Sequence, residues 1–449
     1  MSFDVQSSLI FSTALLSVNL FALLVMGIYA LRHYAYTLLF IAMKLGSKKK
    51  QNNHVENLSY FPRVSILVPA HNEENVIADL LSSLVSQEYP RDKMEIIVIN
   101  DGSTDRTGEI ARGFANSYPG LVKVVEVAEG GKGKANALNI GLDHATGDVI
   151  LVFDADYIAT TDSVAKLVYY LTAGGYQLIQ GQVIPYNTQK LFSKVVALER
   201  TVGYLCEFPV RDRYGLFIQY AGTVGGFKRD VINTLGKWDK SSLAEDTDLT
   251  CRATLKGYRI KYEQDIIGFE QAVEDMWAYF KQRFRWAKGH TICCLRYFKA
   301  LAKAKNISLR KKIDGLLVLF MYLSPISWLL TSIFILATVI LNPLLSPIIL
   351  SIPFIGDLFW VSVAFWLFIF SALFVESLVS VALSGVGLRR HIVPLMLIPI
   401  VGHGMAMTCV LALVDLALDR VFRAGEHTWE RTEKKRGITF EIDGVVFRG

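Results

Sequence analysis

Residues 149–156 read Val-Ile-Leu-Val-Phe-Asp-Ala-Asp, and this short stretch decides the fold class of the chain. Five consecutive apolar residues predict a buried strand, which delivers the carboxylates of Asp154 and Asp156 to its exposed end. Hard oxygen ligands of this kind suit Mg²⁺ or Mn²⁺, which can keep positions open for phosphate oxygens. The alternative is a solvated acidic turn. The stretch indicates a metal-assisted transferase that uses an activated phosphate donor.

The segments before this stretch repeat a pattern of strand, turn and helix. Apolar runs at residues 64–68, 96–99 and 122–127 predict further buried strands, and a helix is expected to open at Glu73. This alternation favours an α/β domain with a mostly parallel, Rossmann-like sheet. Ligands of such sheets bind at the carboxyl ends of the strands, where the acidic residues stand.

The composition indicates membrane spans. The chain has 449 residues, 52% of them hydrophobic, and a positive mean hydropathy. Residues 9–31 carry no charge, and the residues before them lack the basic start of a cleaved signal peptide, which predicts a retained span. Further candidates lie at residues 315–356, 358–388 and 392–414, where the first run has expected breaks at Asn342-Pro343 and Pro347. The predicted division is 1–50 transmembrane helix and basic linker, 51–312 catalytic domain, 313–418 transmembrane helices, and 419–449 basic tail.

The distribution of basic residues predicts the topology. Arg32, Lys44 and residues 48–50 follow the first span, which places the polar block in the cytoplasm of a multi-pass plasma membrane protein, with the N-terminus outside. Three C-terminal spans would put the basic tail, residues 420–436, outside, against the same rule. Either residues 315–356 hold two spans, or one later segment is re-entrant or interfacial. Both alternatives stay open.

The cysteine spacing argues against a zinc site, and the distribution of charge argues against nucleic-acid binding. The five cysteines show no zinc-like spacing, and a cytoplasmic domain keeps its thiols reduced, so no disulfide is expected. The net charge is +6, and the basic residues cluster beside the spans. Lipid headgroups are therefore expected as partners, and no nucleic acid.

Two turns could bind a nucleotide. Asp101 follows the strand at 96–99, where it could accept a hydrogen bond from a base or ribose; capping of its own turn is the alternative. Gly130 to Lys134 could bring backbone amides and a lysine close to phosphate. It is not a Walker loop, because Ala135 stands where that motif has Ser or Thr. A solvated loop is the alternative there.

Glu245 and Asp246 stand at the expected start of a helix. Asp246 could act as a general base, which needs a carboxylate within hydrogen-bond reach of the acceptor hydroxyl. The alternative is that acidic residues favour helix N-termini through the macrodipole.

Gln282, Arg285 and Trp286 are one helical turn apart or adjacent, so they can share a face. Arginine suits diphosphate charge, and tryptophan offers a flat platform for a sugar ring. The alternative is an amphipathic helix on the membrane, since residues 280–288 are rich in basic and aromatic side chains.

Glu376 and His403 fall inside candidate spans, where ionisable groups are expensive and often functional. A hydrogen bond to a neighbouring helix is the preferred interpretation of both. A transporter or receptor would need paired ionisable residues within its spans, and these two alone qualify.

In order and spacing, these motifs resemble a membrane-embedded family-2 glycosyltransferase of the group containing cellulose, chitin, hyaluronan and poly-N-acetylglucosamine synthases. The resemblance covers almost the whole chain. It implies a GT-A-type α/β catalytic domain combined with α-helical transmembrane segments. It also implies inverting transfer, dependent on Mg²⁺ or Mn²⁺, of a sugar from a UDP-sugar donor to a growing β-linked polysaccharide.

The resemblance also implies roles for individual residues. Donor binding would fall to Pro69, Glu73, Asp101, Lys134, Asp154, Asp156, Gln282 and Arg285, with Asp154 and Asp156 also holding the metal. Asp246 would be the catalytic base, and acceptor binding would involve Trp286, Gly222, Thr223 and Glu245.

The chain departs from the family pattern at two points. Asn100 occupies a position that is often a second Asp, and the long C-terminal regulatory domain of bacterial cellulose synthases is missing. Related lipid glycosyltransferases carry similar motifs and spans, so addition of a single sugar to a lipid-linked acceptor is the alternative function.

Overall fold

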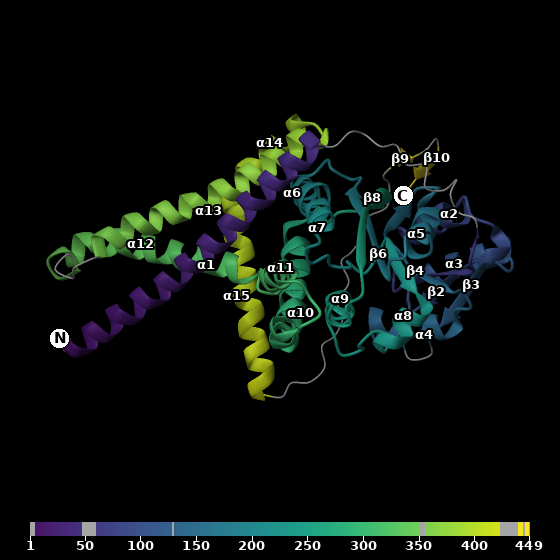
Figure 1. The fold of residues 1–449 in the computed structure, drawn as a ribbon, viewed down its shortest axis with the longest axis horizontal. Coiled ribbons are helices and arrows are strands. Elements are labelled where there is room, and N and C mark those ends of the chain that lie inside the picture. Colours follow the sequence, from purple (N-terminus) through teal and green to yellow (C-terminus); the bar gives the residue numbers. More distant parts are fainter. Residues whose placement is uncertain are drawn as a thin grey trace.

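The computed structural model describes residues 5–46, 60–127, 130–349, 355–422, 439–442 and 445–448. The polar middle of the chain forms an α/β domain, and long apolar helices from both ends of the sequence extend together to one side of it (Figure 1). The two-part architecture expected from the sequence is therefore confirmed.

Within the described residues, eight strands form one sheet in the order β3-β2-β1-β4-β7-β6-β8-β5. The strands are β1 (Val64–Ala70), β2 (Met94–Asn100), β3 (Val122–Glu126), β4 (Val149–Val152), β5 (Tyr157–Ala159), β6 (Leu178–Pro185), β7 (Gly225–Lys228) and β8 (Ile260–Glu270). The first four in space are parallel, whereas β7 is antiparallel to both of its neighbours. The four predicted strands are confirmed, and strands β5 to β8 were not predicted.

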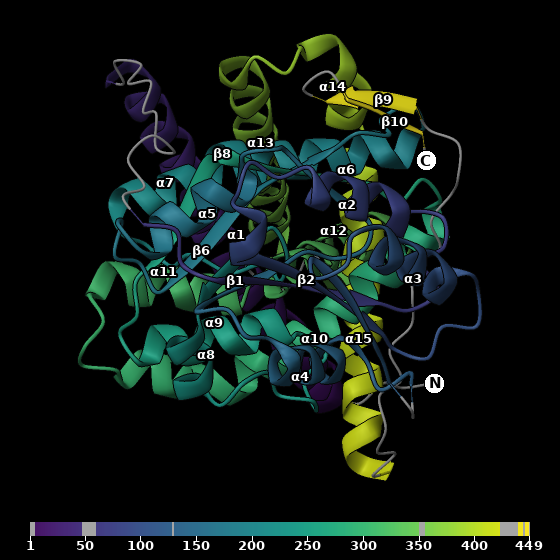
Figure 2. The same ribbon diagram turned by 90° about the vertical axis from the view of Figure 1, so that its right-hand side faces the viewer.

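Helices cover both faces of the sheet. They are α2 (Ile77–Val85), α3 (Thr107–Ser117), α4 (Lys134–His144), α5 (Ser163–Leu171), α8 (Arg229–Leu235) and α9 (Glu245–Leu255), with a short 3₁₀ turn at Arg91–Lys93. Figures 1 and 2 both place α2 and α5 on one face, and α4 and α8 on the other. The apolar side chains of β1, β2 and β4 are almost all fully buried between these layers. Each buried Val, Leu or Ile contributes about 1.5–3 kcal/mol relative to exposure.

The helix expected at Glu73 begins later. Asn72 has a left-handed backbone (φ 56°), and the carbonyl of Glu73 then accepts hydrogen bonds from the amides of Val76 and Ile77. These contacts make a turn, and α2 starts only at Ile77. The predicted position of this helix start was therefore wrong by four residues.

A layer of helices separates the sheet from the apolar helices (Figure 1). It consists of α6 (Leu191–Val202), a π-helical turn (Gly203–Glu207), α7 (Phe208–Tyr214), α10 (Met276–Lys303) and α11 (Leu309–Leu319). The long helix α10 carries Gln282, Arg285 and Trp286.

Among the described residues, four helices are long and apolar enough to cross a membrane. They are α1 (Val5–Gly46), α12 (Leu323–Ile349), α13 (Ile355–Ser384) and α15 (Ile398–Phe422), while the shorter α14 (Leu388–Met396) precedes α15. A separate β-hairpin, β9 (Thr439–Ile442) and β10 (Val445–Arg448), lies near the C-terminus.

Helix α1 extends beyond the uncharged residues 9–31. It continues to Gly46, because Arg32 pairs with Glu207 at 3.3 Å and Phe40 packs against Cys206 in the helical layer. Arg32 and Lys44 therefore belong to this helix, and residues 48–50 lie outside the described residues.

Residues 315–356 contribute one candidate span among the described residues, within α12. The backbone remains helical through Asn342, Pro343 and Pro347, so the predicted breaks at these positions were wrong. Proline is tolerated in apolar helices where the surroundings satisfy the freed backbone groups.

Helix α15 packs along α10 and α12, whereas α1 packs along α12 and α13. Lys288 of α10 lies 2.6 Å from both Asp415 and Asp419 of α15. Further along, a Cβ on Gly404 would come within 2.4 Å of the Phe280 ring, which shows how closely the two helices approach. Helix α15 is therefore held against the surface of the helical layer.

The interpretation of Glu376 and His403 as bonding partners of neighbouring helices is confirmed. Glu376 lies 2.5 Å from Nδ1 of His33 on α1, and Nε2 of His403 lies 2.9 Å from the Ser332 hydroxyl of α12. His33 was not predicted as the partner of Glu376. All five cysteines are buried free thiols, as expected.

Candidate active site

The predicted polar residues meet at one edge of the sheet, because β2, β1 and β4 are parallel neighbours. The amide of Asp101 donates to the carbonyl of Ala70 at 2.8 Å, and that of Phe153 donates to the carbonyl of Leu67 at 3.2 Å. Asp101 and Asp154 therefore follow strands on either side of β1. Since β7 is antiparallel to β4, it starts where β4 ends, and the loop before it reaches the same edge.

Asp101 is buried and only partly satisfied. Its Oδ2 accepts a hydrogen bond from the Gly133 amide at 3.2 Å, while its Oδ1 is buried and accepts none within the described part of the chain. An unsatisfied buried acceptor costs about 1–3 kcal/mol. This oxygen is therefore a place where a ligand donor would be stabilising.

The glycine-rich loop closes over the Asp101 turn. A Cβ on Gly130 would lie 2.3 Å from Cα of Gly102, so only glycine permits this approach. Gly130 therefore packs on the Asp101 turn, while Gly130, Gly131 and Lys132 remain exposed, which agrees in part with the alternative of a solvated loop. Asn100, which departs from the family pattern, donates to Glu126 at 2.6 Å.

Pro69 and Glu73 lie beside the same turn. Pro69 is opposite Ile99 in the register of β1 and β2, one residue before each strand ends. The amide of Glu73, a buried residue, donates to the Thr107 hydroxyl at 2.7 Å.

Lys134 joins several of the predicted residues. As the first residue of α4, it places its ammonium 2.7 Å from Asp154, 3.0 Å from the Gly222 carbonyl and 3.5 Å from Glu245. Lys134 was predicted to lie near a nucleotide, and its contacts with the carboxylates were not predicted. The available signal was a lysine at a helix start directly after a glycine-rich loop.

Burial raises the pKa of the carboxyl groups around Lys134. It raises the pKa of Asp154 to about 6, against the opposing effect of Lys134 and with a further rise from Asp156. Burial also raises the pKa of Glu245 and of Asp246, and Lys134 opposes both rises. The Arg285 guanidinium lies close enough to oppose the rise at Glu245 as well. A further cation would stabilise this group of carboxylates.

The segment with Asp154 and Asp156 fits a divalent cation. Both offer hard carboxylate oxygens, one residue apart, at the end of a buried strand. The Asp154 amide donates to the Thr223 hydroxyl at 3.0 Å, which fixes this segment against the neighbouring loop. These residues match the ligand preference of Mg²⁺ or Mn²⁺.

Asp246 stands in the first turn of α9, opposite the loop of Gly222. The amide of Thr247 donates to its Oδ1 at 2.6 Å. Gly222 has a left-handed φ of 79°, and a Cβ there would lie 3.3 Å from Cβ of Asp246 and 3.2 Å from Nζ of Lys134. The predicted base and the predicted acceptor loop are therefore in contact distance.

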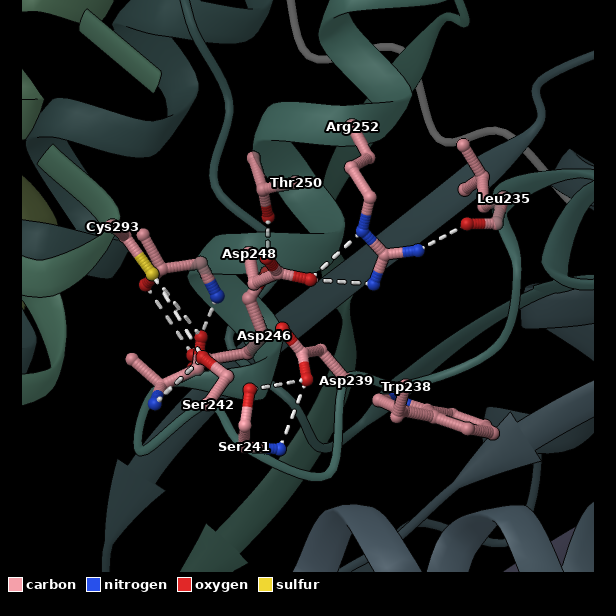
Figure 3. A network of polar contacts seen from close by, with 12 residues as sticks. Leu235, Trp238, Asp239, Ser241, Ser242, Asp246, Asp248, Thr250, Arg252 and Cys293 are labelled. Atoms are coloured by element: carbon pink, nitrogen blue, oxygen red, sulfur yellow. Dashed lines mark hydrogen bonds and ion pairs between the residues drawn. The ribbon is translucent and has the colours of Figure 1, made fainter. Parts of the chain in front are cut away.

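The start of α9 is anchored by Asp248, which is fully buried. Arg252 binds it through two nitrogens at 2.8 and 2.5 Å, and Tyr297 of α10 donates to it at 2.5 Å. Figure 3 shows Arg252 between Asp248 and the carbonyl of Leu235. This network fixes the first turn of α9, with Asp246, relative to α10.

Gln282, Arg285 and Trp286 are partly exposed on α10. Two guanidinium groups lie over the Trp286 indole, those of Arg283 at 4.2 Å and Arg200 at 5.6 Å from its centroid. Neither arginine was singled out from the sequence. Arg283 could have been noticed, because it lies within the Gln-x-x-Arg-Trp motif.

Gly222→Ala is expected to reduce turnover about tenfold, which corresponds to an increase of roughly 1.4 kcal/mol in the activation barrier. The new Cβ would crowd both Asp246 and Lys134. Gly236→Ala is the matched control, because Gly236 has a similar φ of 84° and open space around its Cβ position. Both variants should lose similar thermal stability. Equal turnover of the two would contradict the account.

Comparisons with known proteins show which family the α/β domain matches. Residues 65–235 match the family described as Glycosyl transferase family 2. The chain is 37% identical over 258 residues to "Probable glycosyltransferase YdaM" of Bacillus subtilis, covering 56% of this chain and 60% of that protein. It is 29% identical over 281 residues to "Poly-beta-1,6-N-acetyl-D-glucosamine synthase" of Staphylococcus epidermidis, covering 62% of this chain and 64% of that protein. The matched region therefore spans less than two thirds of the length of these two relatives.

One solved structure shares the fold. It is a mannosyltransferase from Pyrobaculum calidifontis in complex with GDP-Man and Mn²⁺, at 24% identity and a TM-score of 0.50. The similarity covers 81% of this chain and 96% of that chain. This likeness shows a GT-A-like fold for the α/β domain.

Proposed function

We propose that this chain, whose residues 65–235 form a family 2 glycosyl transferase domain, transfers a sugar from a UDP-sugar to a growing β-linked polysaccharide. The main support for the proposal is that Lys134 contacts both sides of the site. Its ammonium group contacts Asp154 on the donor side and the Gly222 loop beside Asp246. The relatives named as poly-β-1,6-N-acetylglucosamine synthases support polysaccharide as the product.

The donor nucleotide would lie at the ends of β1 and β2. The buried unsatisfied oxygen of Asp101 is suited to accept a hydrogen bond from the base or ribose. Pro69 and Glu73 lie beside the same turn, and the loop from Gly130 leads directly to Lys134.

Asp154 and Asp156 would hold Mg²⁺ or Mn²⁺ with the donor diphosphate. When bound, this cation supplies positive charge to the leaving UDP. Lys134 adds an ammonium beside Asp154, and Arg285 adds a guanidinium on the side of Glu245. These fixed charges stabilise the phosphate charge that increases as the sugar leaves.

Asp246 would remove the proton from the attacking hydroxyl. Its position beside the Gly222 loop puts a carboxylate between the donor side and the acceptor loop. The raised pKa makes it a stronger base than an exposed aspartate. Direct displacement from the opposite face of the sugar inverts the anomeric centre and yields a β-linkage from an α-linked donor.

The acceptor sugar would stack on Trp286, with Glu245, Gly222 and Thr223 lining the other side. Gln282 and Arg285 lie on the same face of α10, towards the diphosphate. Addition of one sugar to a lipid-linked acceptor would use the same residues. It is the second candidate because the apolar helix α15 packs along α10, which carries Trp286.

The catalytic domain would lie on the cytoplasmic side of a plasma membrane, because basic residues follow the first span. We propose that α1, α12 and α13 cross the membrane and that α15 lies along its cytoplasmic surface. The ion pairs of Lys288 with Asp415 and Asp419 support this arrangement, because they hold α15 against α10. The basic tail would then remain cytoplasmic, in agreement with the positive-inside rule.

Labelling with a membrane-impermeant maleimide tests this topology. In intact spheroplasts, Ser2→Cys at the outer N-terminus is expected to react and Thr428→Cys in the tail to react only after lysis. The five native cysteines are buried, which keeps the background low. Labelling of Thr428→Cys in intact spheroplasts would mean that α15 crosses the membrane.

A donor screen tests the proposed function. Purified protein in nanodiscs would receive Mn²⁺ or Mg²⁺ and a panel of UDP-sugars, with UDP release and sugar incorporation both measured. UDP-N-acetylglucosamine is the expected donor, in view of the named relatives. Turnover that requires added lipid and yields a single glycolipid would favour the second candidate. No metal-dependent turnover with any donor would contradict a transferase.

A further inference from the structure

The Trp286 indole is oriented by two arginines. The Arg283 Cζ lies 4.2 Å from the ring centroid, and the Arg200 Cζ lies 5.6 Å from it. A guanidinium over an indole face is attracted by the negative potential of that face. The position of the ring therefore depends on what holds the two guanidinium groups.

Neighbouring residues of α6 take part in both arginine contacts. Arg283 is almost fully buried and is ion-paired with Glu199. Arg200, the next residue along α6, forms a two-pronged ion pair with Glu270 at the end of β8, with distances of 2.6 and 3.0 Å. Paired contacts of this type fix geometry as well as charge. Helix α6 thus links α10 to the sheet.

Glu270 continues this link to the acidic segment. Its carboxylate accepts a hydrogen bond from the Tyr157 hydroxyl at 3.0 Å, and Tyr157 directly follows Asp156. Tyr157 and Glu270 are also partners in the register of β5 and β8. The amide of Gln271 donates to the Asp156 carbonyl at 3.4 Å. A continuous set of contacts therefore connects Asp156 with Arg200.

We infer that Arg200 and Glu270 are positioning residues, which hold Trp286 in a fixed place relative to Asp156. The inference rests on the proposed function, in which Asp156 is on the donor side and Trp286 binds the acceptor sugar. Neither positioning residue is among those proposed to contact the donor or the metal. Loosening them should misplace the acceptor while donor binding is retained. A misplacement of about 1 Å can reduce turnover roughly 100-fold.

Arg200→Lys is the first test, because it keeps the charge but loses the two-pronged geometry. Sugar incorporation should fall by roughly 10- to 100-fold, with the donor KM unchanged within about twofold. The ratio of UDP released to sugar incorporated should increase, because water can react with the donor when the acceptor is misplaced. A purely structural role would not produce this change in ratio with unchanged donor KM.

Two further variants separate positioning from misfolding. Glu270→Gln preserves the shape of the side chain and an acceptor for Tyr157, and it should show the same increased ratio. Arg106→Lys is the matched control, because Arg106 also pairs with a carboxylate, Glu109, but on the exposed surface of α3. The control should incorporate sugar at the wild-type rate.

A spectroscopic measurement reports on Trp286 directly. In protein labelled with 5-fluorotryptophan, the fluorine resonance absent from Trp286→Phe belongs to this residue. It should shift or broaden in Arg200→Lys and remain unchanged in Arg106→Lys. An unmoved resonance, or a parallel loss of Mn²⁺-dependent UDP binding, would overturn the inference. The resonance could shift in Arg200→Lys while the wild-type protein itself transfers no sugar. That result would support the contacts of Trp286 and overturn the proposed function.

Discussion

Asp246→Asn is expected to reduce sugar transfer by about a thousand-fold, within the range that general base catalysis contributes. The amide cannot take a proton from the acceptor hydroxyl, although it preserves the size of the side chain and an oxygen for the Thr247 amide. Binding of UDP with Mn²⁺ should be unchanged, because in the proposed mechanism this carboxylate acts on the acceptor. Transfer and binding would be measured on the same preparation, by sugar incorporation and by titration calorimetry.

Asp143→Asn is the matched control for this variant. Asp143 is an exposed aspartate on α4 that pairs with Lys237, away from the carboxylates around Lys134. It should transfer sugar at the wild-type rate. If Asp246→Asn lost UDP binding together with transfer, Asp246 would have a structural or donor-binding role in place of the one proposed.

Asp156→Asn is expected to remove the dependence of UDP binding on metal. The neutral amide is a poor substitute for a carboxylate ligand, so the variant should lose at least about 100-fold in turnover, as removal of several kcal/mol of charge stabilisation predicts. Titration of UDP with and without Mn²⁺ would measure the effect. In the wild-type protein Mn²⁺ should tighten UDP binding, and in the variant it should make little difference.

The two variants should therefore differ in whether metal-stimulated UDP binding is retained. Asp246→Asn should retain metal-stimulated binding without transfer, whereas Asp156→Asn should lose both. Removal of the metal from the wild-type protein with a chelator should reproduce the second pattern. Metal-stimulated UDP binding in Asp156→Asn equal to that of the wild type would contradict the assignment of the metal site.

Short-range sequence patterns were sufficient to predict half of the sheet. The strands that end beside Asp101 and Asp154 are continuous apolar runs, and their burial on both faces is a property of parallel sheets. Parallel neighbouring strands end at the same edge of the sheet, so Asp101 and Asp154 could also be expected to lie near each other. Strand β7 could not be predicted in this way, since Gly-Gly-Phe-Lys has neither an apolar run nor a clear alternation.

Other features depend on contacts between residues far apart in the sequence. Helix α1 continues beyond Leu31 because Arg32 and His33 find partners 175 and 343 positions away, in Glu207 and Glu376. No local signal identifies such partners. The extension of this helix to Gly46 was not predicted for this reason.

Contacts between distant residues also limited the prediction of the candidate active site. The residues around Lys134 belong to recognisable motifs, so most of them were singled out from the sequence. Arg200 and Glu270 belong to no such motif, and their importance becomes visible only when α6 is seen between Trp286 and the acidic segment.

The length of the product formed at low conversion shows whether this protein adds many sugars to one chain. Wild-type protein in nanodiscs would receive Mn²⁺ and labelled UDP-N-acetylglucosamine in large excess, and the product would be sized after a small fraction of the donor is consumed. A polysaccharide synthase that holds its chain between additions should give long, glycosidase-sensitive polymers together with unused acceptor. A product in which every acceptor carries a single added sugar would contradict polysaccharide synthesis, and the absence of any product would contradict the transferase itself.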